Sequence, residues 1–121
     1  MLNNIADKFG KYFYFIFRVL VGLFFLLHGI QKLFSGNFDP TSLIGVAGII
    51  EFVVGILIIL GLWTRIAALI SGIQMLIAYF YVHFQGGFNP LTNGGELALM
   101  FLAAFFVLFT YGAGKWGIDK S

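Results

Sequence analysis

Four long apolar runs fill most of this 121-residue chain, and short breaks rich in Gly, Asn, Asp and Pro separate them. The runs predict helices at about residues 12–34, 42–62, 66–84 and 96–111. An α-helix needs about 20 apolar residues to cross a bilayer core about 30 Å thick, and the runs approach that length. We therefore expect an all-α fold, an integral membrane four-helix bundle formed by a single transmembrane domain over residues 1–121.

The composition supports a location in the bilayer. Hydrophobic residues make up 60% of the chain and charged residues 10%, whereas soluble domains carry about 25% charged residues. With so few charges the chain could not cover a surface exposed to water. The net charge of +2 gives no sign of a nucleic-acid partner. The chain has no cysteine, which excludes thiolate and disulfide chemistry within it.

The positive charges lie asymmetrically with respect to the predicted helices. Only Lys32 lies towards one side of the bundle, and the other six cations lie at or near the opposite side: Lys8, Lys11, Arg18, Arg65, Lys115 and Lys120. Cytoplasmic loops carry the excess of Lys and Arg in membrane proteins. We therefore expect a multi-pass protein of the bacterial or archaeal cytoplasmic (inner) membrane, with both termini in the cytoplasm.

Two of the breaks are alike. Residues 36–40 read Gly-Asn-Phe-Asp-Pro, and residues 86–90 read Gly-Gly-Phe-Asn-Pro. Each follows a helix that carries a histidine and precedes a helix that carries a glutamate. This pattern is compatible with a weak parallel repeat of two hairpins. Common turn residues would give the same similarity without duplication.

Small and polar residues recur at helical spacing, which predicts the faces that pack against neighbouring helices. The first two stripes are Arg18, Gly22, Phe25, Gly29 and Lys32 in helix one, and Gly48, Glu51 and Gly55 in helix two. The other two are Ala67, Ser71, Gln74 and Ala78 in helix three, and Glu96, Ala103 and Thr110 in helix four.

Glu51 is the deepest acid of the chain. It lies about eight residues, or about 12 Å, inside helix two, too deep for its side chain to reach water. His28 and Lys32 are i, i+4 neighbours near the outer end of helix one. The short connection to helix two makes these helices an antiparallel hairpin, so we expect Glu51, Lys32 and His28 to form a polar centre. A structural ion pair would have the same residues.

Four further residues are secondary candidates. Arg18 is close enough to the cytoplasmic interface for its guanidinium to reach lipid head groups, and Gln74 suits a hydrogen bond between helices. Glu96 stands in the first turn of helix four, where an acid complements the helix dipole. His83 lies among aromatic residues typical of the membrane interface. No catalytic residue and no metal site is predicted. A bis-histidine haem would need His28 and His83 at matching depth on facing helices; both lie towards the outer side, so haem stays a remote alternative to quinone as the cofactor.

Several short motifs together resemble the DoxX family of small membrane proteins. The motifs are Arg18-x-x-x-Gly22, His28-Gly29-x-x-Lys32, Glu51-x-x-x-Gly55, Gly61-x-x-Thr64-Arg65-x-Ala67, Met75-x-x-Ala78, Gly95-Glu96 and Gly112-x-Gly114. The resemblance implies four helices in the inner membrane. It also implies a relationship to the DoxD-type subunit of a thiosulfate:quinone oxidoreductase, and to partners of a complex that links thiol and radical detoxification. Glu51, Lys32 and Arg18 match polar positions of the family.

These features favour a membrane subunit of a redox or stress-related complex that contacts quinone, with a protein partner or a second copy of the chain. We do not expect the chain to be an enzyme on its own. One alternative is a binding or assembly module whose polar seam is structural. A second is a carrier or channel for a small solute, which would need an oligomer because four helices enclose little space.

Overall fold

The computed structural model describes residues 1–120, which form helices and no strand. The elements are α1 (Leu2–Leu33), α2 (Leu43–Leu60), α3 (Thr64–Ile77), the π-helical η1 (Ala78–His83), the 3₁₀ turn η2 (Phe84–Gly86) and α4 (Glu96–Tyr111). The all-α prediction is confirmed.

Two helices begin earlier than the apolar pattern predicts. α1 starts at Leu2, because no proline interrupts residues 2–11 and the helix continues through Asn3, Asn4, Asp7 and Gly10 despite their low helix propensity. α3 starts at Thr64, two residues before the predicted position, because the carboxylate of Asp119 accepts hydrogen bonds from the backbone N–H groups of Trp63 and Thr64. This cap comes from a residue 55 positions away, so no local pattern announces it.

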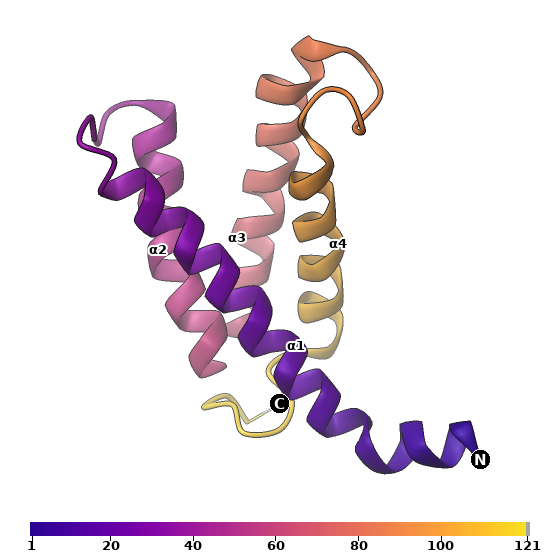
Figure 1. The fold of residues 1–121 in the computed structure, drawn as a ribbon. Coiled ribbons are helices and arrows are strands. Elements are labelled where there is room, and N and C mark those ends of the chain that lie inside the picture. The colour runs from indigo at the N-terminus through magenta and orange to yellow at the C-terminus, as the bar shows by residue number, and fades with distance from the viewer. Residues whose placement is uncertain (121) are drawn as a thin grey trace.

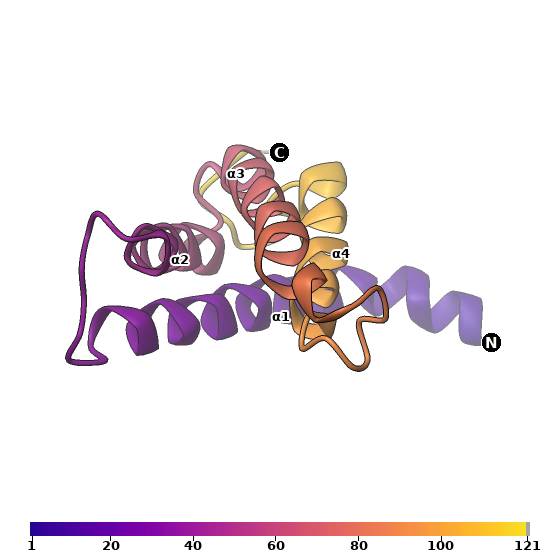
Figure 2. The ribbon, with the colours of Figure 1, turned by 90° about the horizontal axis from the view of Figure 1, so that it is seen from above.

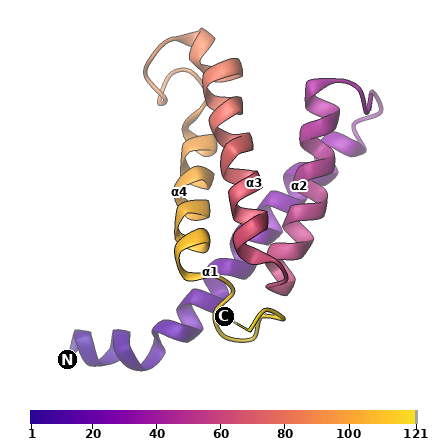
Figure 3. The same cartoon turned by 180° about the vertical axis from the view of Figure 1, so that it is seen from behind.

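The helices form two antiparallel pairs, α1 with α2 and α3 with α4 (Figure 1). Loops 34–42 and 87–95 lie at one end of the molecule, which we call the loop end. The α2–α3 turn and residues 112–120, the C-terminal segment, lie at the other end, which we call the terminal end (Figure 3). The pairs meet near the terminal end and diverge towards the loop end, and seen from above α1 runs along one side of the other three helices (Figure 2).

Glycines allow α1 and α2 to pack backbone against backbone. A Cβ at Gly29 would lie 2.5 Å from the backbone N of Phe52, and a Cβ at Gly55 would lie 2.7 Å from the backbone N of Leu26. The buried positions of α1 are Arg18, Gly22, Phe25 and Gly29, and those of α2 include Gly48, Glu51 and Gly55. The predicted faces of helices one and two are thus confirmed as packing faces.

The predicted face of helix four is wrong. Ala103, Thr110 and Glu96 are exposed, and the buried face of α4 carries Ala98, Phe101, Leu102, Phe105 and Leu108. Phe101 and Phe105 stack at 5.9 Å between ring centroids, and both contact the ring of Phe25 on α1. Large aromatic side chains therefore fill the wider space beside α4, where small residues would leave a void.

Helices α1, α2 and the continuous α3–η1–η2 segment (Thr64–Gly86) are long and apolar enough to cross a membrane, and α4 is a shorter apolar helix of 16 residues. Large apolar side chains such as Ile66, Phe80 and Phe106 are exposed on the outside of the helices. A protein in water rarely exposes so much apolar surface, whereas lipid is a suitable neighbour for it. The chain is a membrane protein.

The two similar breaks fold into the same turn. Oδ1 of Asp39 accepts a hydrogen bond from the backbone N–H of Thr41, and Oδ1 of Asn89 accepts one from the backbone N–H of Leu91. An Asx residue before proline favours this turn wherever it occurs. The shared turn therefore explains the similarity locally, and the repeat stays a prediction.

Candidate functional site

A hydrogen-bonded network joins three helices near the loop end. Nζ of Lys32 (α1) lies 2.7 and 2.9 Å from the two carboxylate oxygens of Glu51 (α2), and Nε2 of Gln74 (α3) lies 2.7 Å from Oε2 of Glu51. The side chain of Glu51 is 3% exposed and that of Lys32 is 31% exposed. Glu51 is thus enclosed by protein, as a carboxylate within hydrocarbon must be, and its charge is paired.

The close approach of α1 and α2 positions this ion pair. A Cβ at Gly48, one turn before Glu51, would lie 2.9 Å from Cβ of Lys32. Only a glycine there lets the Lys32 stem pass α2 and reach Glu51. Ser42 begins α2 as its N-cap, with its hydroxyl accepting a hydrogen bond from the backbone N–H of Gly45, and this fixes where Glu51 stands along the helix.

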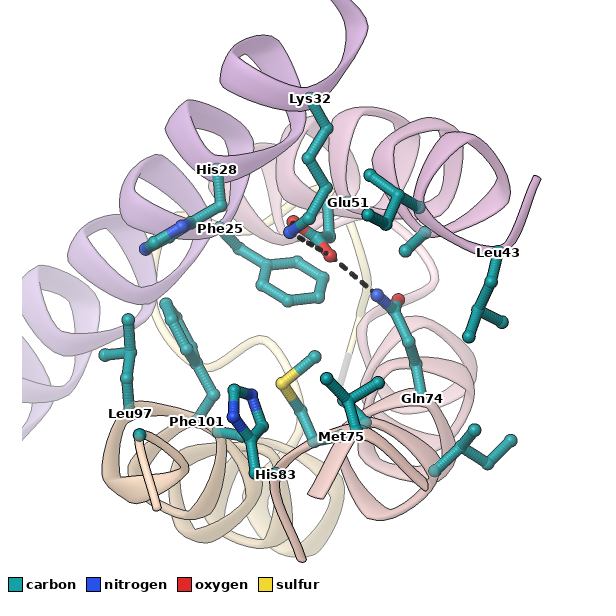
Figure 4. Close-up of a pocket in the computed structure, with 17 residues that line it drawn as sticks. Phe25, His28, Lys32, Leu43, Glu51, Gln74, Met75, His83, Leu97 and Phe101 are labelled. Atoms are coloured by element: carbon teal, nitrogen blue, oxygen red, sulfur yellow. Dashed lines mark hydrogen bonds and ion pairs between the residues drawn. The ribbon is translucent and has the colours of Figure 1, made fainter. Parts of the chain in front are cut away.

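The network borders a cavity of about 340 Å³ between the two helix pairs (Figure 4). Most of its lining is apolar, including Phe25, Leu43, Met75 and Phe101, and its polar residues are His28, Lys32, Glu51, Gln74 and His83. A mostly apolar cavity of this size with a few converging polar groups is typical of a small-molecule site.

His28 and His83 stand on different sides of the cavity. His28 is half-buried near α4, where its ring packs edge-on against the ring of Phe101 with centroids 5.8 Å apart. His28 lines the same cavity as Lys32 and Glu51. The side chain that completes the hydrogen-bonded network with Glu51 is Gln74. His83 also lines the cavity, so the prediction that it is an interface residue misses this position. It is the last residue of the π-helical η1, a geometry frequent at functional sites.

Gln74 belongs to the polar centre more closely than the sequence indicated. A carboxylate can only accept hydrogen bonds, so the Gln74 amide must present its NH₂ group to Glu51. Its Oε1 is then left buried without a partner in the described part of the chain. A buried acceptor is costly to leave unpaired, so a ligand with a hydrogen-bond donor would be favoured at this point of the cavity.

Arg18 does not reach for lipid head groups, and that prediction is wrong. The residue is 1% exposed, and its guanidinium donates to carbonyls at the end of α2 and in the C-terminal segment. The acceptors are the carbonyls of Ile58, Ile59, Ala113, Lys115 and Trp116. A guanidinium has five N–H donors, so one buried arginine can donate to several backbone carbonyls at once. Arg18 is therefore a structural clasp, remote from the cavity.

Glu96 stands exposed in the first turn of α4, as expected of an acid that complements the helix dipole, and it does not line the cavity. No group of three or more His, Cys, Asp or Glu within residues 1–120 is placed to hold a metal ion.

Many of the residues that carry the family resemblance lie in two places in the structure. Lys32 and Glu51 belong to the polar network and Gly29 and Gly55 allow the close packing of α1 on α2 beside it, whereas Arg18, Gly61 and the C-terminal segment build the clasp at the terminal end. The DoxX family model matches residues 13–84. The chain belongs to the DoxX family.

Relatives of this DoxX protein occur in Haemophilus influenzae and Mycobacterium tuberculosis. An uncharacterized protein of Haemophilus influenzae is 41% identical over an alignment of 132 positions that covers 98% of this chain and 96% of that protein. An uncharacterized membrane protein of Mycobacterium tuberculosis is 31% identical over 125 positions, covering 85% of this chain and 77% of that protein. No solved structure matches.

Proposed function

We propose that this DoxX protein is a membrane subunit of a redox or stress-related complex and that its cavity binds the head group of a quinone. The observation that supports this most is the convergence of Lys32, Glu51 and Gln74 with His28 and His83 on one mostly apolar cavity within a membrane protein. A quinone is an apolar ring with two carbonyl acceptors, and its reduced form carries hydroxyl donors instead.

The residues of the cavity fit both forms. The Lys32 ammonium has three N–H donors, and two of them suffice for the carboxylate oxygens of Glu51. The third can donate to a carbonyl. The buried Oε1 of Gln74 is an acceptor suited to a hydroxyl. The rings of Phe25 and Phe101 supply the apolar walls.

A quinone supplies two-electron chemistry that requires two protons. Glu51 is the buried carboxylate that would hold a proton near the ligand. Lys32 is partly exposed and would connect Glu51 with the surface at the loop end. His28 and His83 are further proton carriers on the cavity wall. The electrons would come from a partner, because no thiol or metal-ligand cluster occurs in the described residues. We therefore propose a protein partner and assign no separate enzymatic activity.

The charge pattern supports an inner-membrane orientation with both termini in the cytoplasm, which would place the cavity in the outer half of the bilayer. A reporter that is active only in the periplasm should give a signal when inserted at Gly87 and none when fused after Lys120. The opposite result would reverse the orientation and place the cavity on the cytoplasmic side.

Equilibrium binding of a short-chain benzoquinone to the purified protein in nanodiscs tests the function. The His28→Phe variant keeps the contact with Phe101 and leaves the ion pair intact, so it should fold normally. It should bind at least tenfold more weakly, as should Glu51→Gln, while Glu96→Gln should bind as the wild type does. If His28→Phe and Glu51→Gln fold and bind the quinone normally, the protein is better described as a binding or assembly module. The Lys32–Glu51–Gln74 network would then have a structural role only. Solute flux in liposomes would instead support the carrier.

A further inference from the structure

A second hollow lies on the lipid-facing side of the molecule, between α1 and α4. It has a volume of about 260 Å³ and its lining is apolar except for one histidine. The residues that line it are Phe17, Leu20, Val21, Phe24, His28, Leu97, Met100, Phe101 and Ala104. We call this hollow the α1–α4 groove.

The groove and the central cavity share part of their walls. His28, Leu97 and Phe101 line both of them, and Figure 4 shows these three residues together at the side of the cavity where α1 faces α4. The edge-on contact of His28 with Phe101 thus stands at the junction of the two spaces. A ligand that extends from the cavity into the groove would pass between these side chains, not through a helix.

The groove is long and open to the bilayer. From His28 to Phe17 it follows eleven residues of α1, or about 16 Å at 1.5 Å per residue. Leu20, Phe24 and Met100 are 45%, 53% and 64% exposed along it. Its shape is therefore that of a channel for a flexible apolar chain, with its one polar group at the end that meets the cavity.

We propose that the α1–α4 groove holds the apolar tail of an amphiphilic ligand whose head occupies the central cavity, with His28 at the junction of head and tail. This inference rests on the proposed function and narrows the ligand to a quinone with a long membrane-embedded tail. A water-soluble quinone would leave the groove to the surrounding lipid.

The physical advantage of the groove is packing. Lipid is as apolar as the groove, so a tail gains little by transfer from one to the other. It gains close contacts with side chains that have fixed positions, and it holds the attached head at the junction. The tail should consequently be sensitive to the shape of the groove, and a side chain that fills the groove should exclude it.

Neighbouring alanines of α4 offer a matched test. Ala104 lines the groove, whereas Ala103 is exposed and lines neither space. The affinities of Ala104→Phe and Ala103→Phe in nanodiscs would be compared for a benzoquinone with a decyl tail and for the same head group without a tail. The concentration of each quinone within the nanodisc would be measured, so that partitioning into lipid is not counted as binding.

We expect Ala104→Phe to weaken binding of the tailed quinone at least tenfold and to leave the tail-less quinone unchanged. Ala103→Phe should change neither. If Ala104→Phe binds the tailed quinone normally, or weakens both quinones equally, the groove holds lipid and this inference is wrong while the proposed function stands. If the wild type binds neither quinone, the proposed function is wrong, and the inference is wrong with it.

Discussion

Arg18 and Ala113 lie 95 positions apart in the sequence, and a hydrogen bond of 2.5 Å from Nη1 of Arg18 to the carbonyl of Ala113 joins them. The same guanidinium bonds the carbonyls of Ile58 and Ile59 at the end of α2. One side chain of α1 thus holds the end of α2 and the C-terminal segment together. The clasp closes the terminal end of the bundle, and the helix pairs diverge only towards the cavity.

Replacing Arg18 with Gln should loosen this end of the molecule. Each buried carbonyl that loses its donor costs about 1–3 kcal/mol, so we expect a loss of about 3 kcal/mol or more in stability. Thermal unfolding in detergent would measure this loss of stability. Proteolytic cleavage within residues 112–120 should also become faster in Arg18→Gln. The control is Arg65→Gln, since Arg65 is exposed and bonds only the carbonyls of Phe109 and Thr110. Equal stability of the two variants would contradict the clasp.

The clasp should also open in acid, through Asp119. Burial raises the pKa of Asp119, but its hydrogen bonds from the backbone N–H groups of Thr64 and Trp63 outweigh this and hold the pKa below the ordinary value of 3.8. The ionised carboxylate therefore stabilises the fold above pH 3.8, and this contribution is lost as the pH falls through the lowered pKa.

Hydrogen exchange of residues 112–120 between pH 7 and pH 3 measures this opening, once the intrinsic pH dependence of exchange is subtracted. Wild-type protection should decrease at the acid end, whereas Asp119→Asn should be less protected at neutral pH and change less with pH. Asp39→Asn is the control: hydrogen bonds donated by the hydroxyl and the backbone N–H of Thr41 lower the pKa of Asp39, but Asp39 lies at the loop end. If the protection of residues 112–120 changes with pH equally in Asp119→Asn and Asp39→Asn, Asp119 is not the cause of the opening in acid.

The sequence alone was sufficient to predict the packing of α1 on α2 and the meeting of Lys32 with Glu51. Glycines and charges at heptad spacing mark a single face of each helix, and a short loop leaves only an antiparallel hairpin. Gln74 was marked by the same spacing on α3. Its bond to Glu51 could not be predicted, because the sequence does not indicate how α3 is rotated against α2.

Other features had no signal in the sequence. α4 is apolar on nearly every side, so no periodicity in the sequence distinguishes its core face. The face that is buried carries the large side chains of Phe101 and Phe105, which fill the space beside α1. The partners of Arg18 are backbone carbonyls, which every residue possesses and no motif reveals. The π-helical turn that brings His83 to the cavity is likewise a property of backbone geometry rather than of residue type.

Gly55 provides a third prediction. A Cβ at this position would lie 2.7 Å from the backbone N of Leu26, and backbone cannot move aside as a side chain can. Gly55→Ala should therefore separate α1 from α2 and destabilise the protein by about 1–3 kcal/mol, despite the better helix propensity of alanine. Gly10→Ala is the matched control, since nothing lies within 4 Å of a Cβ there. Thermal unfolding should show a loss only for Gly55→Ala, and equal behaviour would mean that the α1–α2 contact is looser than described.

The final prediction separates the structural role of the Lys32–Glu51 pair from its functional role. Removing one partner of a buried ion pair leaves an uncompensated charge, which costs about 3–5 kcal/mol, whereas removing both charges together is often neutral. Lys32→Met should therefore unfold at a much lower temperature, because it leaves Glu51 enclosed without its cation. Glu51→Gln should be affected less, because Lys32 is partly exposed and can turn towards water.

The double variant Lys32→Met with Glu51→Gln should regain much of the lost stability, and its thermal unfolding would be compared with both single variants in the same nanodiscs. Binding of the benzoquinone should not return with it, because the donor for a carbonyl and the ionisable carboxyl are both gone. Recovery of stability without recovery of binding is the result expected of a site. If binding returns together with stability, the pair serves only to hold α1 and α2 in place, and the head group must be bound by other residues of the cavity.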